Sequence, residues 1–273
     1  MCDICVMTSV KEQMLSRRGF FKASAAGAAA VTVGTATSAP PALAAGHGRV
    51  EDMTHEWSED FPTYFGAPGV SREQTFNFKD NGFNLLNLQV NEHTGTHLDA
   101  PLHFSADGQA VNEIPVENLV CPLCCIDIRE RAASDADAQV TPEDLNAWIS
   151  ANGPIPDKAC VAMLSGWGAK TGGDGFRNAD DKGAMHFPGF HVEAAQMLIE
   201  ETGAVGMAVD TLSLDHGPSQ DFATHYAWLP SNRWGIENLA NLENVPAAGA
   251  TLIVGSPKLK GGTGGPSRIF ALV

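Results

Sequence analysis

Apolar residues along this chain gather in short runs, and these runs predict strands more often than helices. Five runs rich in Val, Ile, Leu and Cys have the length of buried strands. They cover residues 124–129, 160–165, 204–211, 250–255 and 267–273. A further pair of apolar runs flanks Asn81-Gly82 within residues 76–90, and that dipeptide favours the tight turn of a β-hairpin.

Two segments carry helical patterns with recognisable ends. The first begins at Thr141 as the N-cap, has Pro142 in the first helical position followed by acidic residues, and ends at Gly153. The second covers residues 191–203, with apolar residues at helical spacing and a terminal glycine. Many strands with few helices predict a mixed α/β domain that has more strand than a doubly wound fold.

The composition supports one globular domain after the N-terminal segment. The chain has 273 residues, of which 44% are hydrophobic, and no repeat or low-complexity linker divides residues 46–273. Its net charge of −15 predicts an acidic surface that repels phosphate backbones. We therefore expect small molecules rather than nucleic acids as partners.

Residues 1–45 differ from the rest of the chain and have the features of an export signal. Arg17 and Arg18 precede Gly-Phe-Phe-Lys in a twin-arginine pattern, an Ala/Gly-rich stretch follows, and the small residues at 42–44 suit signal peptidase. The alternative is a transmembrane anchor, but the stretch is rich in Gly, Thr and Ser and lacks a long run of Leu, Ile and Val. These features predict a Tat-exported periplasmic protein whose mature form is not held in a membrane.

Four cysteines follow the predicted leader, and they allow more than one interpretation. Cys121, Cys124 and Cys125 lie in "CPLCC", and Cys160 begins another apolar run. A single C-x-x-C pair, without a second Cys or His pair at zinc-finger spacing, gives weak support to a metal or redox site. The apolar neighbours favour cysteines that pack as small hydrophobic residues, and a disulfide between two of them is the alternative.

The segment "NEHTGTHLDAPLHF" concentrates His93, His97, Asp99 and His103. In a strand, residues four apart are separated by about 13 Å, whereas ligands lie about 2 Å from a metal ion. A helix would leave Asp99 apart from the first two histidines, and Gly95 between threonines is poor helix sequence. A strand that breaks and turns at Gly95 can gather all three. A polar loop without a metal is the alternative.

The residue types in this segment suit a divalent cation. Imidazole together with carboxylate fits Zn²⁺ or Mn²⁺ and requires no thiolate. Pro101 stiffens the exit from the turn and sets the direction of His103. A histidine just outside a ligand set is a natural proton carrier near neutral pH. The segment therefore predicts a metal site with a catalytic base beside it.

The same residues resemble those of a known family. "HTGTHLDAPLH" resembles the H-x-G-T-H-x-D-x-P-x-H motif of the cyclase family of metal-dependent hydrolases, which includes bacterial kynurenine formamidase and isatin hydrolase. The resemblance continues over essentially all of residues 50–273, with "SGWG", "VGMAVDTLSLD" and "GIENLANL" in family order. Ser165 stands where the family has Thr, and Gly265 stands where it has Ser.

The resemblance implies a swivelling β/β/α fold, a homodimer or homotetramer, and one or two Zn²⁺ or Mn²⁺ ions. The family's metal ligands correspond to His93, His97, Asp99, His225 and Glu237, and its catalytic histidine corresponds to His103. Asp99 matches the carboxylate that bridges to a second ion. Without the resemblance, a lone histidine and a lone glutamate late in the chain would be interpreted as surface residues.

We therefore expect a metal-dependent hydrolase that cleaves an amide, such as the aryl formamide N-formylkynurenine, with His103 as acid and base. The alternatives are hydrolysis of an isatin-type lactam, a cyclic imide or a lactone on the same fold, and a periplasmic protein that binds metal without turnover. A structural zinc site is disfavoured because such sites have four closed ligands, usually with Cys. Candidates for an aromatic pocket, with core packing as the alternative for each, are Trp57, Phe65, Trp167 and Phe187.

Overall fold

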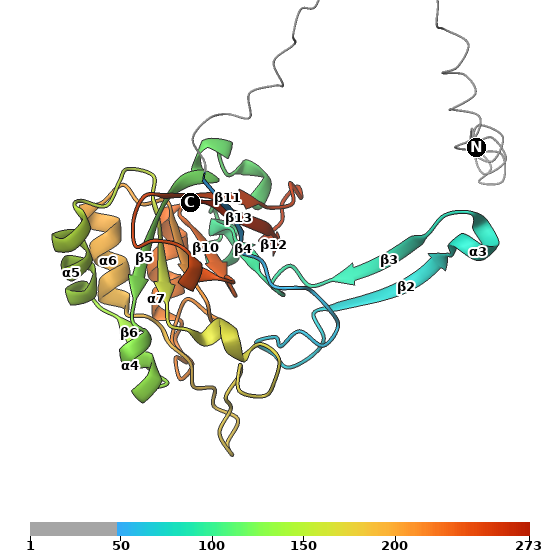
Figure 1. Ribbon diagram of the computed structural model, residues 1–273, viewed down its shortest axis with the longest axis horizontal. Coiled ribbons are helices and arrows are strands. Elements are labelled where there is room, and N and C mark those ends of the chain that lie inside the picture. The colour runs from blue at the N-terminus through green and yellow to red at the C-terminus, as the bar shows by residue number, and fades with distance from the viewer. Residues whose placement is uncertain (1–47) are drawn as a thin grey trace, which may run out of the picture. The chain divides into compact units, whose positions relative to one another are not determined.

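The computed structural model describes residues 48–273, so the predicted leader lies outside the described residues. Nine strands form the main sheet: β1 (Val50–Asp52), β4 (His97–Asp99), β5 (Val120–Asp127), β7 (Cys160–Leu164), β9 (Gly206–Val209), β10 (Trp234–Glu237), β11 (Ala250–Gly255), β12 (Gly264–Pro266) and β13 (Arg268–Leu272). Their spatial order is β1-β13-β11-β5-β7-β9-β10-β4-β12. Of these strands, β4, β5, β10, β11, β12 and β13 are labelled in Figure 1.

The centre of this sheet is parallel and its two sides are antiparallel. Strands β5, β7, β9 and β10 run parallel, whereas β11, β13 and β1 on one side and β4 and β12 on the other pair antiparallel. This arrangement confirms the predicted mixed α/β class. The five predicted strands all form, but β5 begins four residues earlier than predicted, because residues 120–123 pair with β11.

The two predicted helices both form, and they cover one face of the sheet. Helix α5 (Pro142–Asn152) begins after Thr141, whose backbone N–H donates to Asp144 at 2.8 Å, and α6 (Val192–Glu201) begins after His191. Their apolar sides pack on alternate residues of the parallel strands, such as Val161 and Met207. Two short helices were not predicted, namely α4 (Arg129–Ser134) and α7 (Ala223–Trp228).

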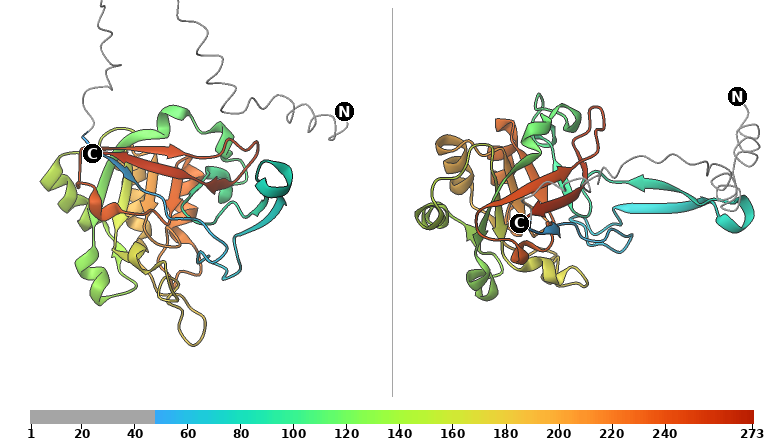
Figure 2. Two further views of the ribbon diagram at one scale, coloured as in Figure 1. Left: turned by 45° about the vertical axis from the view of Figure 1, so that its right-hand side comes forward. Right: turned by 45° about the horizontal axis from the view of Figure 1, so that its top comes forward.

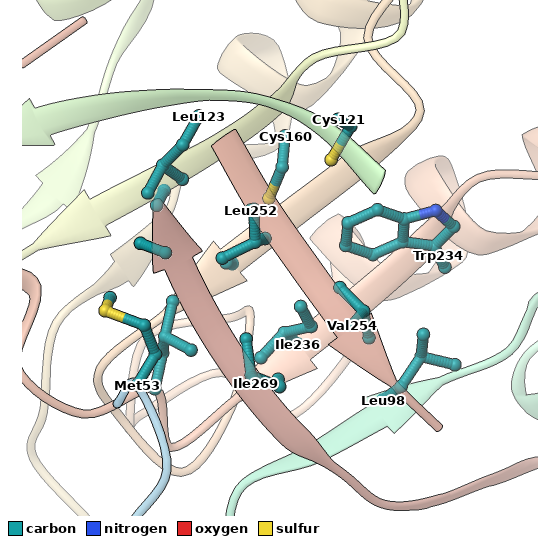
Figure 3. Close-up of a cluster of buried hydrophobic side chains, with 14 of the residues drawn as sticks. Met53, Leu98, Cys121, Leu123, Cys160, Trp234, Ile236, Leu252, Val254 and Ile269 are labelled. Atoms are coloured by element: carbon teal, nitrogen blue, oxygen red, sulfur yellow. The ribbon is translucent and has the colours of Figure 1, made fainter. Parts of the chain in front are cut away.

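The opposite face of the sheet holds a second core, enclosed by the antiparallel strands β11 and β13. Figure 3 shows Leu252 and Ile269 from these strands beside Leu123, Ile236 and Cys160. All four cysteines of the described residues are free and buried, and burial raises the pKa of the thiols of Cys121, Cys124 and Cys125 to about 12. They pack as small hydrophobic side chains.

A long hairpin projects from the body of residues 48–273 (Figures 1 and 2). We call it the arm, and it consists of β2 (Val70–Phe76) and β3 (Leu85–Val90), which pair only with each other among the described residues. The prediction of a hairpin is confirmed, but its tip is not a two-residue turn. The chain forms one helical turn, α3 (Phe78–Asn81), and Gly82 ends it in a left-handed conformation with φ 80°.

The remaining regular elements are short. Strands β6 (Gln139–Val140) and β8 (Gly189–Phe190) form a small parallel pair. The 3₁₀ turns are η2 (Pro101–His103), η3 (Val111–Glu113), η4 (Val116–Asn118), η5 (Trp167–Lys170), η6 (Leu229–Ser231) and η7 (Leu242–Asn244). No helix within residues 48–273 combines the length and the apolar character that a membrane crossing requires.

Candidate metal centre

The histidine-rich segment folds as a turn followed by a short strand. Gly95 has a φ of 62°, which places the break in the chain where the sequence predicted it. Strand β4 follows, and its alternation puts His97 and Asp99 on one face while Leu98 enters the core. His103 is the last residue of η2, which begins at Pro101.

The neighbours of β4 complete the surroundings of these side chains. In the β10–β4 ladder, Glu237 lies directly opposite His97 and Gly235 lies opposite Asp99. On the other edge, Gly264 of β12 also lies opposite Asp99. A Cβ atom at Gly264 would come within 2.8 Å of the His93 ring. The absence of a side chain at Gly264 therefore leaves room for the His93 ring beside Asp99, and at Gly235 it leaves room for Leu214.

His225 enters the same space from α7, and Asp215 fixes its position. The Asp215 carboxylate accepts from the backbone N–H of Thr224 at 2.8 Å and of His225 at 3.1 Å, at the start of the helix. The same carboxylate lies 2.6 Å from Nδ1 of the His225 ring. Since the carboxylate can only accept, Nδ1 carries the proton and the other ring nitrogen, Nε2, points away from Asp215.

The hydrogen bonds of His97 determine its tautomer in the same way. Its Nδ1 lies 2.9 Å from the carbonyl oxygen of Gly95, which can only accept, so Nδ1 is the donor. Nε2 then carries a lone pair in the neutral ring. It lies 3.3 Å from Asp99 Oδ1 and 3.4 Å from Glu237 Oε2.

His93 presents a lone pair through a longer chain of hydrogen bonds. The hydroxyl of Thr263 donates its hydrogen to Glu92, so it must accept from Nε2 of His93, which lies 2.9 Å away. In the neutral ring, Nδ1 therefore carries a lone pair and no hydrogen. It faces Asp99 Oδ1 at 2.6 Å.

When the three rings are neutral, their three lone pairs and the two carboxylates converge, and only a cation or added protons can lie between them. We call His93, His97, Asp99, His225 and Glu237 the ligand cluster. Two of its buried atoms, His97 Nε2 and Asp99 Oδ2, have no hydrogen-bond partner in the protein. Nε2 of His225 lies 3.2 Å from Glu237 Oε1 and 3.8 Å from Asp99 Oδ2.

A positive charge is required where these atoms meet. Burial opposes charging of His97, but Asp99 and Glu237 outweigh it and raise the pKa of His97 to about 10. For His225, Asp215, Asp99 and Glu237 likewise outweigh burial and raise its pKa. Either protons or a cation can supply the charge, and nitrogen with carboxylate ligands suits Zn²⁺ or Mn²⁺. The ligand cluster therefore fits the divalent cation predicted from the sequence.

Asp99 occupies the centre of the arrangement. It belongs to both groups whose ligand atoms are close enough to share one ion, namely His97, Asp99 and Glu237, and His93, Asp99 and His103. A carboxylate common to two groups can bridge two ions. This geometry accommodates either one ion or two.

His103 lies beside the ligand cluster. Its ring stacks on that of His93, with centroids 3.8 Å apart and an interplanar angle of 20°. Burial lowers the pKa of His103 to about 4, so the ring is neutral at pH 7. A neutral ring in this position can accept a proton. It can also serve as a further metal ligand, because its nitrogen lies close enough to the ligand atoms of His93 and Asp99 to hold one ion with them.

A cavity of about 350 Å³ opens onto the ligand cluster and His103. For the four aromatic candidates, the sequence left pocket lining and core packing as alternatives, and the structure separates them. Of the four predicted aromatic residues, Phe65 lines the cavity, whereas Trp167 and Phe187 are buried together in a separate apolar cluster and Trp57 packs against Gly95. The other aromatic lining residues are Tyr64, Phe104 and Phe222. These three were not singled out in the sequence because a lone aromatic residue without periodicity carries no signal.

The structure brings all six predicted site residues together, and it adds others that were missed. Asp215, Thr263 and Asn238 are polar residues that hold the imidazoles or their turn in place. The sequence offered a signal for Asp215, which ends the "VGMAVDTLSLD" segment that resembles the family, although no role was assigned to it.

Comparisons with known proteins agree with this geometry. The sequence profile of the cyclase family matches residues 51–216. The isatin hydrolase of Roseibium aggregatum is 34% identical over 196 residues, which are 68% of this chain and 73% of that protein. The structure of isatin hydrolase A from Ralstonia solanacearum is 33% identical, with a TM-score of 0.79, and the match covers 90% of this chain and 100% of that one. The kynurenine formamidase of Salinibacter ruber is 28% identical over 192 residues, 70% of this chain and 81% of that protein. The chain belongs to the cyclase family of metal-dependent hydrolases.

Proposed function

We propose that this protein hydrolyses the C–N bond of a cyclic aromatic amide, such as the lactam of isatin. The observation that carries the proposal is the cavity of about 350 Å³, whose aromatic side chains stand beside the ligand cluster and His103. Flat aromatic rings stack on such walls. The similarity to isatin hydrolases supports the same substrate class.

The aryl formamide expected first from the sequence becomes the second candidate. The kynurenine formamidase of Salinibacter ruber is 28% identical, against 34% for the isatin hydrolase of Roseibium aggregatum. Both substrates have an aromatic ring next to a scissile amide, so the cavity accommodates either chemistry. The comparisons favour the lactam.

The residues of the ligand cluster would hold the ion. A divalent cation bound there would lower the pKa of a water molecule toward neutrality and polarise a carbonyl oxygen. The two carboxylates and three imidazole nitrogens are held in place before any ligand arrives, by Gly95, Asp215, Thr263 and the β4–β10 pairing. Preorganised groups of this kind lose little freedom during the reaction.

His103 carries the proton in this mechanism. Its neutral ring accepts a proton as water adds to the amide carbon, and it returns that proton to the nitrogen as the C–N bond breaks. The products are a carboxylic acid and an amine, which in a lactam stay on one molecule. Phe104 and Phe222 lie close to the His225 ring, at centroid distances of 4.6 and 5.8 Å, and exclude water from that side.

The test is hydrolysis by protein loaded with Zn²⁺ or Mn²⁺, offered isatin, N-formylkynurenine and a cyclic imide in parallel. We expect kcat/KM to be highest for isatin. A higher kcat/KM for N-formylkynurenine would replace the lactam with the formamide. If the protein binds metal tightly but turns over none of these substrates, the result would favour the alternative function, a protein that binds metal without catalysis.

Export is a separate proposal that rests on the twin-arginine pattern at Arg17 and Arg18. We propose that the protein crosses the membrane folded, so that its metal can be acquired before export. Fractionation of cells expressing the full chain should recover a shortened protein from the periplasm. Replacement of both arginines by Lys should retain the uncut chain in the cytoplasm.

The exposed arm supports a further proposal, that two copies of this chain associate. An isolated two-stranded ribbon is marginally stable in water, and this one exposes Leu86 (48%) and Leu88 (53%). Strand β3 contains no charged residue, although the chain carries a net charge of −15. Two identical acidic molecules repel each other over most of their surface, so an uncharged apolar strand is where they can meet. We therefore propose that the arm contacts a second copy of this chain.

A further inference from the structure

Asn238 occupies an unusual position at the end of β10, directly after the ligand Glu237. Its φ is 57°, in the left-handed region that only a few non-glycine residues tolerate. It is nonetheless buried, with 2% of its surface exposed. A buried residue that keeps such a backbone conformation is held there by its surroundings, which directs attention to its contacts.

The contacts of Asn238 join the turn of the histidine segment to two neighbouring strands. Its side-chain Nδ2 donates to the carbonyl oxygen of Gly95 at 2.9 Å. Its own carbonyl accepts from the hydroxyl of Thr96 at 2.6 Å, and its backbone N–H donates to Thr211 at 2.9 Å. One residue therefore connects the end of β10, the segment that follows β9, and Gly95 and Thr96 of the turn.

The carbonyl of Gly95 is the atom on which this arrangement depends. It accepts from Nδ2 of Asn238 and from Nδ1 of His97, each at 2.9 Å. A carbonyl oxygen has two lone pairs, and both are used here. Because Asn238 fixes the direction of the carbonyl, the remaining lone pair points at Nδ1 of His97 and keeps the proton there.

We propose that Asn238 is a positioning residue for the metal centre, which acts by fixing the tautomer and ring orientation of His97 through the Gly95 carbonyl. The inference rests on the proposed metal-dependent function and adds a residue to it. Groups that orient a histidine ligand through its second nitrogen change metal affinity by about 10- to 100-fold when they are removed. Asn238 acts indirectly: it orients the Gly95 carbonyl, and this carbonyl orients the His97 ring.

The decisive variant is Asn238→Gly, because glycine accepts a positive φ and removes only the side chain. Asn241→Gly is the matched control. Asn241 also has a positive φ, of 58°, and its Nδ2 also donates to a backbone carbonyl, that of Asp52, at 2.6 Å. It is exposed and lies outside the cavity, so its loss reports only the general effect of such a change.

Zn²⁺ affinity is measured by competition with a chromogenic chelator, and the melting temperature is measured on the same metal-free samples. We expect Asn238→Gly to weaken Zn²⁺ binding by about 10- to 100-fold, and Asn241→Gly to leave it unchanged. In the Zn²⁺-loaded protein, the ring N–H signal of His97 should be present in the native chain and lost or shifted in Asn238→Gly.

A purely structural role gives a different result. If Asn238→Gly melts at a lower temperature than the native chain but binds Zn²⁺ with unchanged affinity, the proposal is wrong. If this variant does not fold, Asn238→Asp decides, because it keeps the shape and loses the donor; unchanged Zn²⁺ affinity there also overturns the proposal. If the native protein binds Zn²⁺ but hydrolyses no amide, the proposed function is wrong. The role of Asn238 in Zn²⁺ binding can still be tested in the same way.

Discussion

Glu237 and His97 face each other across the β10–β4 ladder, and the carboxylate oxygen Oε2 lies 3.4 Å from the ring nitrogen Nε2. These two residues are 140 positions apart in the sequence, yet strand pairing makes them neighbours. The pairing sets their separation before any ion binds. Three residues of the ligand cluster, His97, Asp99 and Glu237, thus lie on strands of the main sheet, whereas His93 precedes β4 and His225 comes from α7.

Substitution of Glu237 by Gln tests whether this carboxylate is a ligand. The amide keeps the size of the side chain, and its oxygen can still accept from the backbone N–H of Leu214, which lies 3.1 Å from Oε1. We expect Zn²⁺ affinity to fall by more than the roughly 100-fold that loss of an outer hydrogen bond causes. Chelator competition measures it. Native affinity in the variant would remove Glu237 from the ligand cluster.

Asp215 should act on metal binding without touching the ion. In Asp215→Asn, the amide oxygen can still accept from Thr224 at the start of α7, but the NH₂ group cannot accept from Nδ1 of His225. The affinity for Zn²⁺ should fall by about 10- to 100-fold. Asp221→Asn removes the same charge from the exposed neighbouring loop and should change nothing. Equal losses in both variants would point to overall charge instead.

His103→Ala distinguishes a proton carrier from a ligand. If His103 carries the proton, turnover should fall by about 10²- to 10⁴-fold while the metal content is unchanged. Elemental analysis and steady-state kinetics on one preparation measure both. Loss of metal would instead make His103 a ligand, as its position beside His93 and Asp99 allows. His186→Ala, at a histidine outside the cavity, is the control.

Metal binding should release protons, and its affinity should rise with pH. Burial alone would lower the pKa of His97, but the carboxylates of Asp99 and Glu237 outweigh it and raise this pKa to about 10. His97 therefore carries an extra proton below that pH, and a binding ion must displace this proton. Each displaced proton makes the affinity about tenfold stronger per pH unit. Calorimetry at pH 6, 7 and 8, in buffers of different ionisation enthalpy, counts the protons. A Kd that does not change with pH would contradict the charged state of His97.

The arm predicts the oligomeric state. Leu88→Asp places a charge on the face that Leu86 shares, and we expect the native mass measured by light scattering to fall to that of one chain. Gln89→Asp places the same charge on the opposite face of the strand and should have a smaller effect. A single-chain mass for the native protein would refute the proposed association.

The sequence by itself determined the local part of the site. The turn at Gly95 and the shared face of His97 and Asp99 follow from residue types and spacing within one short segment, and the structure has both. The same is true of the helix that begins after Thr141 and of the buried runs that form the parallel strands. Such features depend on neighbours in the chain, so the sequence contains their causes.

Only the tertiary structure decided which distant residues meet that segment. His225 and Glu237 could be assigned in the sequence only through family resemblance, and Asp215 and Asn238 were not assigned at all. Their roles depend on the pairing of β4 with β10 and on the placement of α7, which the packing of the whole sheet determines. The aromatic lining could not be decided from the sequence for the same reason, because burial of Trp167 and Phe187 in a separate core depends on contacts between segments far apart in the chain.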